Sequence, residues 1–256
     1  MVPLGRRGLP ELPQATRCKL CLAPSGGLIS RLARLVGRRR AAASSPLCSR
    51  CLRDVASGCE REVSILFADV RGSTALAERL TPTGFSEVMR GFYSRATAVV
   101  GRFDGTVDKF VGDGVVALFF GGESRDHARS AVDAAHALIA SLEGDRESRP
   151  WPPVAVGVHT GTAWLGLIPG PHGTDDLTAL GDPVNVAAHL CAAAGAGEVA
   201  VSTDACNAAG VREPAAARSL RLKRRTRPIA ARFSGGAAQS CFAPDGGESK
   251  SLRYSP

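Results

Sequence analysis

Aromatic side chains are scarce in this sequence, and it has no long apolar run. Phe, Trp and Tyr make up 5% of the 256 residues, whereas apolar residues together reach 44%, close to average globular usage. The longest uninterrupted apolar run is Val115–Phe120, far shorter than the roughly 18 residues of a membrane-spanning helix. The composition therefore excludes a fibrous or wholly disordered chain, and we expect no transmembrane segment.

Two further absences concern architecture and compartment. No internal repeat recurs at a period of roughly 20–50 residues, which excludes a solenoid or a propeller. The apolar stretch of a secretory signal is missing after Arg6 and Arg7, because Pro10, Glu11 and Pro13 stand in its place. We therefore expect a cytoplasmic protein whose eight cysteines remain reduced.

The net charge of +8 is unevenly distributed along the chain. Residues 1–61 carry +9, residues 62–211 carry −8, and the remaining residues carry +7. A nucleic-acid-binding fold usually has a basic face of its own, whereas an acidic module can be acidic because it holds cations. We therefore expect metal-binding carboxylates in the middle of the chain and no nucleic-acid partner.

The chain divides into four parts by composition. Residues 1–60 form a cysteine-rich module with a basic arm, and residues 61–204 form the main domain. Residues 205–235 are a basic extension that we expect to pack on this domain, and the Gly-, Ser- and Pro-rich residues 236–256 are a flexible tail.

Strand and helix patterns alternate in the main domain. The apolar periodicity predicts an amphipathic helix from Phe85 to Phe103, which ends before Asp104 and Gly105. The other expected elements are strands at 63–68, 154–159, 162–167 and 198–202, a hairpin of strands 107–111 and 115–120, and helices starting at 72–73 and spanning 126–142 and 183–194. This order predicts an α+β fold of the ferredoxin-like (split βαβ) type.

Two aspartates end predicted strands that would be neighbours in that fold. Asp69 ends the first strand and Asp113 lies at the tip of the hairpin. Two converging carboxylates suit a hard cation such as Mg²⁺ or Mn²⁺, and the backbone N–H groups of Gly72, Ser73 and Thr74 suit phosphate. Each aspartate alone could instead cap a helix or make a turn, but together they favour a metal site.

Four ordered motifs closely resemble the class III adenylate/guanylate cyclase catalytic domain. The resemblance covers residues 62 to about 204, so it implies the ferredoxin-like fold of these cyclases. A diguanylate cyclase is excluded because its Gly-Gly-Asp/Glu-Glu-Phe turn is missing. The motifs are Ile65–Thr74 (ILFADVRGST), Asp108–Phe119 (DKFVGDGVVALF), Val156–Gly161 (VGVHTG) and Thr178–Leu190 (TALGDPVNVAAHL).

The resemblance implies an activity, two metal ions and a substrate. It implies conversion of a nucleoside triphosphate to a 3′,5′-cyclic monophosphate and pyrophosphate, with two Mg²⁺ or Mn²⁺ ions on Asp69 and Asp113. Lys109 and Thr178 match the two purine-selecting positions. Lys109 is a donor and adenine N1 is an acceptor, which favours ATP; otherwise the two are an exposed hairpin lysine and an ordinary strand-end threonine.

The resemblance also indicates where this chain departs from the family. Asn185 matches the asparagine that orients the ribose, but His189 stands where the family has a transition-state arginine. Imidazole is shorter than guanidinium and cannot bind phosphate bidentately. Three alternatives remain: a protonated His189 takes the role, Arg71 or Arg129 compensates, or the domain is a weak or inactive cyclase that binds nucleotide as a regulatory module.

The resemblance implies that the aspartates and the remaining site residues come from different domains. The partner domain supplies the purine selectors and the Asn185 and His189 positions. We therefore expect a head-to-tail homodimer with two equivalent sites. His159 lies in the third motif, where we expect a structural histidine and no catalytic role.

Two cysteine pairs precede the main domain. Cys18-x-x-Cys21 and Cys48-x-x-Cys51 predict a four-thiolate structural Zn²⁺ site, with redox pairs or an iron–sulfur cluster as alternatives. Cys59 could replace one ligand but fits a free thiol better.

A short basic amphipathic helix is expected between the pairs, at residues 28–40. It could contact anionic lipid as a peripheral membrane surface, a regulatory protein partner of the amino-terminal module or nucleic acid, the last being the weakest function. A solvated face packed on the rest of the chain explains it equally well.

Overall fold

A computed structural model describes residues 18, 20–21, 47–121, 127–144, 151–169, 175–211, 218–220 and 228–235. The predicted basic helix at 28–40 and the predicted tail at 236–256 lie outside these residues. The strands are β1 (Cys59–Val70), β2 (Thr106–Val111), β3 (Gly114–Phe120), β4 (Val154–Pro169), β5 (Asp175–Leu180), β6 (Glu198–Ser202), β7 (Arg218–Leu220) and β8 (Ile229–Gly235). The helices are α2 (Ser49–Ala56), α3 (Ser73–Arg79), α4 (Pro82–Arg102), α5 (His127–Glu143), α6 (Asp182–Ala193) and α7 (Thr203–Ala208).

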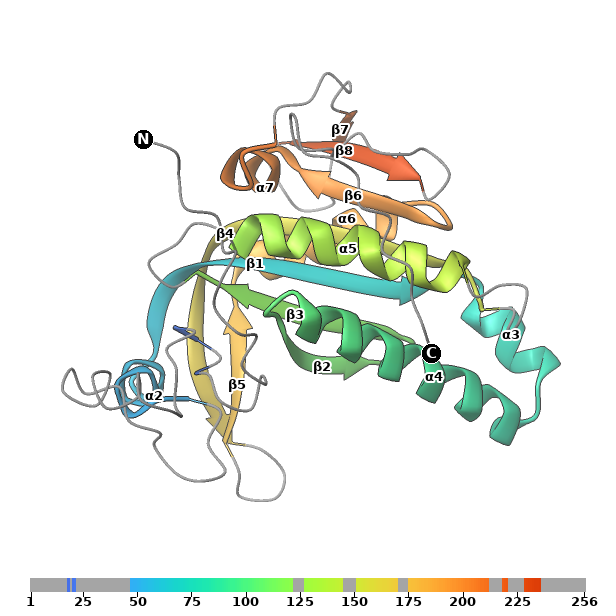
Figure 1. Cartoon of the computed structure of the whole chain (residues 1–256), viewed down its shortest axis with the longest axis horizontal. Coiled ribbons are helices and arrows are strands. Elements are labelled where there is room, and N and C mark those ends of the chain that lie inside the picture. The colour runs from blue at the N-terminus through green and yellow to red at the C-terminus, as the bar shows by residue number, and fades with distance from the viewer. Residues whose placement is uncertain are drawn as a thin grey trace, which may run out of the picture.

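One eight-stranded sheet organises the molecule (Figure 1). Its order is β2-β3-β1-β4-β6-β8-β7, and β5 pairs with β4 away from this path. The first four strands pair antiparallel in the order β2-β3-β1-β4, with α4 and α5 as the connections. This is the split βαβ arrangement, so the predicted α+β ferredoxin-like fold is confirmed.

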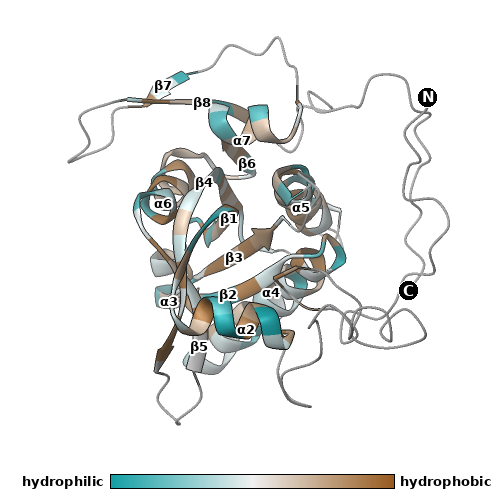
Figure 2. Cartoon of the chain, turned by 90° about the vertical axis from the view of Figure 1, so that its left-hand side faces the viewer, coloured by the Kyte–Doolittle hydropathy of each residue, from teal (hydrophilic) through white to brown (hydrophobic). Residues whose placement is uncertain are grey.

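Helices cover both faces of the sheet, so residues 63–70 of β1 are buried or half-buried on both sides, whereas Glu60, Arg61 and Glu62 are exposed. Helices α4, α5 and α7 pack on one face, where Leu66 and Ala68 point. Helix α6 and the cysteine module pack on the other face, where Val63 and Ile65 point. Figure 2 shows α5 and α6 on opposite sides of the sheet. A strand segment buried on both faces reads as a continuous apolar run, as Ile65–Ala68 does.

Helix α4 ends within one residue of its predicted end but begins three residues earlier than predicted, at Pro82 rather than Phe85. The Thr81 hydroxyl caps it by accepting from the Gly84 N–H at 3.1 Å. After its end, Asp104 adopts a φ of 62°. A Cβ on Gly105 would lie 2.6 Å from the Phe119 ring, so the turn requires glycine there. None of the helices in the described residues is long and apolar enough to cross a membrane.

The structure corrects one predicted break and adds elements that were not predicted. Strands were expected at 154–159 and 162–167, but β4 runs without interruption from Val154 to Pro169. Gly161 does not interrupt the strand. A Cβ there would lie 3.1 Å from Pro183 Cγ, so the glycine lets α6 approach the strand. The elements missed are α2, β5, α7, β7 and β8, most of them shorter than eight residues.

Candidate active site

The ends of β1 and β3 bring Asp69 and Asp113 together. Asp69 pairs with Gly114 across the two strands, and the Val70 N–H donates to the Asp113 carbonyl at 3.3 Å. A Cβ on Gly114 would lie 3.4 Å from Asp69 Oδ1. The predicted convergence of the strand end with the hairpin tip is therefore present in the structure.

The two carboxylates make this end of the sheet electronegative. Burial raises the pKa of Asp69, and the charge of Asp113 raises it further, while Arg71 lowers it. Half-buried carboxylates that repel one another are stabilised by a divalent cation between them. The donor set thus fits Mg²⁺ or Mn²⁺.

Arg71 links Asp69 to the end of α6. Its guanidinium lies 3.4 Å from Asp69 Oδ2 and donates to the carbonyls of Ala194, at 3.1 Å, and Cys191. A cation at a helix C-terminus binds the last carbonyls favourably. Arg129, the other arginine considered as a substitute for the missing one, pairs with Asp133 on α5 at 3.1 Å.

Lys109 and Thr178 lie together although they are distant in sequence. Lys109 Nζ donates to Thr178 Oγ1 at 2.8 Å, and Thr178 Oγ1 donates to Asp108 Oδ2 at 3.2 Å. The side chain of Lys109 is 47% exposed, whereas that of Asp108 is 4% exposed. The two predicted purine selectors therefore form one polar group, together with a carboxylate that the sequence analysis did not select.

Asn185 and His189 lie on the exposed face of α6, whose other face packs on the sheet through Val186 and Leu190. The C-terminal end of α6 reaches Asp69 through Arg71. Asn185 precedes Ala194 by nine residues, which is about 13 Å along a helix axis. Within one chain, the fold thus separates Asn185 from the aspartates.

The turn between β1 and α3 carries the predicted phosphate-binding backbone. Gly72 adopts a φ of 71°, a conformation that favours glycine, and Ser73 begins α3. The Arg71 N–H donates to the Pro153 carbonyl at 2.8 Å, which fixes the start of the turn.

Tyr93 was missed by the sequence analysis as a site residue. It lies on α4, and its hydroxyl donates to the Gly112 carbonyl in the turn that carries Asp113. The centroid of its ring lies 4.6 Å from the centroid of the Phe110 ring. Helical periodicity assigned Tyr93 to the core. In the sequence, only its polar hydroxyl indicated a further contact.

His159 has the structural role that we expected. It is buried, and its Nδ1 hydrogen-bonds to Ser202 Oγ at 2.8 Å. Ser202 also caps α7 by accepting from the Ala205 N–H.

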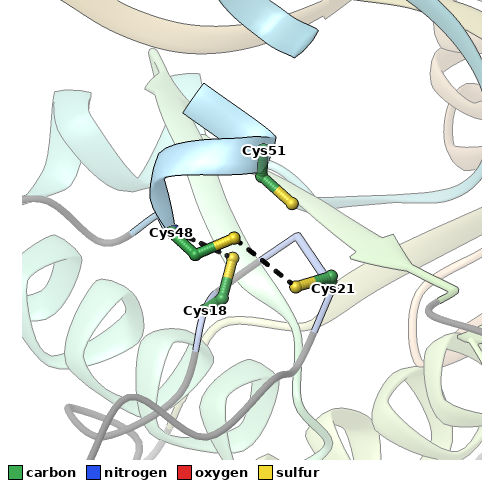
Figure 3. A group of neighbouring side chains, drawn as sticks. All are labelled: Cys18, Cys21, Cys48 and Cys51. Atoms are coloured by element: carbon green, nitrogen blue, oxygen red, sulfur yellow. Dashed lines mark hydrogen bonds between the residues drawn. The ribbon is translucent and has the colours of Figure 1, made fainter. Parts of the chain in front are cut away.

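The four cysteines of the two pairs form a cluster beside α2 (Figure 3). Their sulfur atoms all lie within 4.8 Å of one another, and Cys21 Sγ is 3.8 Å from Cys48 Sγ. Hydrogen bonds with Cys21 and Cys51 lower the pKa of Cys18, while hydrogen bonds with Cys18 and Cys21 raise the pKa of Cys51. Four sulfurs this close ionise together only around a cation, so the cluster fits a four-thiolate metal site.

Cys59 lies outside this cluster, at the start of β1, where it pairs with Leu165 of β4. The cluster packs on the sheet face that also holds Val116 and Leu118. A regulatory protein contacting the amino-terminal module remains a prediction, because the basic helix that suggested it is outside the described residues.

Comparison with known proteins adds a family to this geometry. Residues 55–221 match the family model described as the adenylate and guanylate cyclase catalytic domain. An adenylate cyclase of Anabaena cylindrica is 28% identical over 142 residues, which cover 54% of this chain and 28% of that protein. This chain thus corresponds to little more than a quarter of that relative.

Solved structures agree on the fold. The adenylyl cyclase CyaB from P. aeruginosa aligns with a TM-score of 0.62 at 23% identity, over 69% of this chain and 95% of that one. The guanylyl cyclase Cya2 aligns with a TM-score of 0.63 at 24% identity, over 69% of this chain and 92% of that one. Because one neighbour is an adenylyl cyclase and the other a guanylyl cyclase, fold alone does not select the base.

Proposed function

We propose that this chain, which belongs to the adenylate and guanylate cyclase catalytic-domain family, converts ATP to 3′,5′-cyclic AMP and pyrophosphate. The observation that carries the proposal is that two groups of neighbouring residues are present in one chain. One is the adjacent carboxylates of Asp69 and Asp113, and the other is the contact between Lys109 and Thr178. The first group suits divalent cations and phosphate, and the second suits a purine.

Asp69 and Asp113 would hold two Mg²⁺ or Mn²⁺ ions. When bound, such ions polarise the ribose 3′-hydroxyl and neutralise charge on the triphosphate. The backbone N–H groups of Gly72, Ser73 and Thr74 would donate to the phosphates. Arg71, held between Asp69 and α6, would keep this end of β1 in place.

Lys109 and Thr178 would bind the base. The ammonium of Lys109 offers only donors, which match the N1 acceptor of adenine and repel the N1–H donor of guanine. We therefore assign ATP as the substrate, in agreement with the Anabaena relative named as an adenylate cyclase.

Asn185 and His189 would act on the reacting centre of a second copy. Both are exposed on α6 and point away from the sheet of their own chain. Asn185 would orient the ribose, and a ring N–H of His189 would donate to the developing negative charge.

A head-to-tail homodimer would place these residues against the aspartates of the partner. Exposed apolar side chains on β2, β4 and β5 support this assembly, because burial of exposed apolar surface favours association. In the described residues, they are Phe110, Val111, Trp164, Ile168 and Leu180.

A regulatory nucleotide-binding module is the second candidate function. It is favoured by one observation, the histidine at position 189, because losing a preorganised donor costs on the order of 10²–10³ in turnover. Saturable ATP binding without a cyclic product would select it.

The cysteine cluster would hold a structural Zn²⁺ ion. Four thiolates complete a tetrahedral shell and leave no position for chemistry. The cluster packs against β1 and β3, so the ion would hold the amino-terminal module on the catalytic sheet.

The test of the activity is a product assay. Purified protein is incubated with Mn²⁺ and either ATP or GTP, and cyclic products are separated by chromatography. We expect cyclic AMP from the wild type and none from Asp113→Ala. Cyclic GMP as the main product would overturn the choice of base.

A further inference from the structure

Asp108 lies at an irregularity of β2. Val107 pairs with Ala117 and Lys109 pairs with Val116, so Asp108 is an extra residue in the pairing of β2 with β3. Consecutive side chains of a regular strand point to opposite faces, but a bulge re-aims one of them. Asp108 and Lys109 are adjacent in sequence, and both nevertheless contact Thr178 on β5.

Chemistry fixes the direction of each hydrogen bond in this group. An ionised carboxylate only accepts, so the Thr178 hydroxyl donates its single proton to Asp108 Oδ2. The Lys109 ammonium donates to Thr178 Oγ1 and lies 3.2 Å from the same carboxylate oxygen. The carboxylate is buried and the lysine half-exposed, so the group runs from the interior towards solvent.

We propose that Asp108 is the positioning residue of the base-binding site. It aims the ammonium of Lys109 and makes the Thr178 hydroxyl an acceptor towards a ligand. This inference rests on the proposed function, whose two purine selectors it explains. Asp108 acts through those residues and does not touch the base.

The resulting pattern of donors and acceptors matches adenine and opposes guanine. Asp108 and Thr178 occupy two of the three ammonium protons, and the third is directed at an acceptor such as adenine N1. Thr178, whose own proton is committed, accepts from a donor such as the exocyclic amine of adenine. Guanine presents the reverse order on this edge, a donor at N1 and an acceptor at O6.

Burial makes the arrangement specific. A buried carboxylate is costly unless it is paired, so the native position of Asp108 depends on Lys109 and Thr178 remaining beside it. Asparagine at this position has a similar shape but no charge, and its amide can donate to the hydroxyl. The Thr178 proton would then be free to turn towards a ligand.

The test is equilibrium binding of 3′-deoxy-ATP and 3′-deoxy-GTP, which lack the attacking hydroxyl, measured by calorimetry with Mn²⁺. We expect wild type to prefer the adenine nucleotide and Asp108→Asn to lower that preference about tenfold, the size of one misplaced hydrogen bond. Asp54→Asn is the matched control, because Asp54 pairs with Arg61 at 3.0 Å on the surface. This control keeps the wild-type preference.

A combined mutant separates positioning from a general structural role. If Asp108 acts through Lys109 and Thr178, Asp108→Asn changes the preference no further in a background that carries both Lys109→Met and Thr178→Val. Equal weakening of both nucleotides together with a lower melting temperature would overturn the inference. The inference would also be overturned if wild type forms cyclic AMP and Asp108→Asn prefers the adenine nucleotide as strongly as wild type does. A third outcome would overturn the proposed activity alone. In it, wild type prefers 3′-deoxy-ATP and Asp108→Asn does not, but wild type forms no cyclic AMP.

Discussion

The hydroxyl of Tyr93 on α4 donates a hydrogen bond to the carbonyl of Gly112 in the turn between β2 and β3. Asp113 is the next residue, so the helix holds the turn that presents this carboxylate. Burial and the charge of Asp113 both raise the pKa of Tyr93, which keeps the hydroxyl protonated as a donor.

Tyr93→Phe removes this hydrogen bond and leaves the ring contact with Phe110 intact. We expect Mn²⁺ affinity to fall about fivefold to tenfold, since a lost hydrogen bond costs about 1 kcal/mol. Titration with Mn²⁺, followed by electron paramagnetic resonance, measures the affinity without turnover. An unchanged affinity would show that the turn is held by the strands alone.

Asp69 gives the stability of the metal-free protein a pH dependence of known sign. Burial and Asp113 raise its pKa in the folded state, so the folded chain binds the proton more tightly than the unfolded chain. The penalty for ionisation is then absent below the unfolded pKa and fully present above the folded pKa.

Asp69→Asn removes this penalty. At pH 7.5 without metal, we expect the variant to melt about 1–3 °C higher than wild type, a small effect because water screens the half-exposed group. The difference should vanish below about pH 4. Mn²⁺ should stabilise wild type only. A variant that is less stable than wild type at pH 7.5 without metal would contradict this electrostatic account.

His189→Arg tests whether the missing arginine limits turnover. We expect cyclic AMP formation to rise by less than the order of 10²-fold that a complete donor is worth, because guanidinium binds phosphate bidentately and imidazole does not. Ala98→Arg on the exposed side of α4 is the control, because it adds the same charge to a helix away from α6. An unchanged rate in His189→Arg would rule out the missing arginine as the bottleneck.

The cysteine cluster predicts one Zn²⁺ ion per chain in protein purified under reducing conditions. Elemental analysis should find this ion in wild type and in Cys59→Ser, because Cys59 lies outside the cluster. Cys51→Ser should lose the ion and unfold more easily, since Cys51 is buried against Val55 and the sheet. Wild type that contains no zinc by elemental analysis would contradict this assignment.

The elements that sequence predicted best are those with a strong periodic pattern. Helix α4 shows its apolar face over 21 residues, β3 is apolar from Val115 to Phe120, and β1 contains the apolar run Ile65–Ala68. Strand β5 reads DDLTAL and has no such pattern, because its pairing with β4 comes from the long-range fold. The predicted break in β4 was wrong because Gly161 allows close contact with α6 and does not form a turn.

The site could be predicted where residue type carries the chemistry. The sequence predicted that Asp69 and Asp113 converge and that the two cysteine pairs come together, because each pattern combines a metal-ligating residue type with a fixed spacing. Asp108 and Tyr93 were missed because their importance depends on a bulge and on a contact between distant segments. Local sequence contains neither of these features.

Mixing two inactive variants tests the composite site directly. Asp69→Asn lacks a metal ligand and Lys109→Met lacks a base selector, so each homodimer has two defective sites. In a head-to-tail heterodimer one site carries both substitutions and the other carries neither. Equal mixing should therefore restore about a quarter of the wild-type rate of cyclic AMP formation from ATP with Mn²⁺. A mixture that stays inactive beside an active wild type, or a wild type that forms no cyclic AMP, would contradict the account.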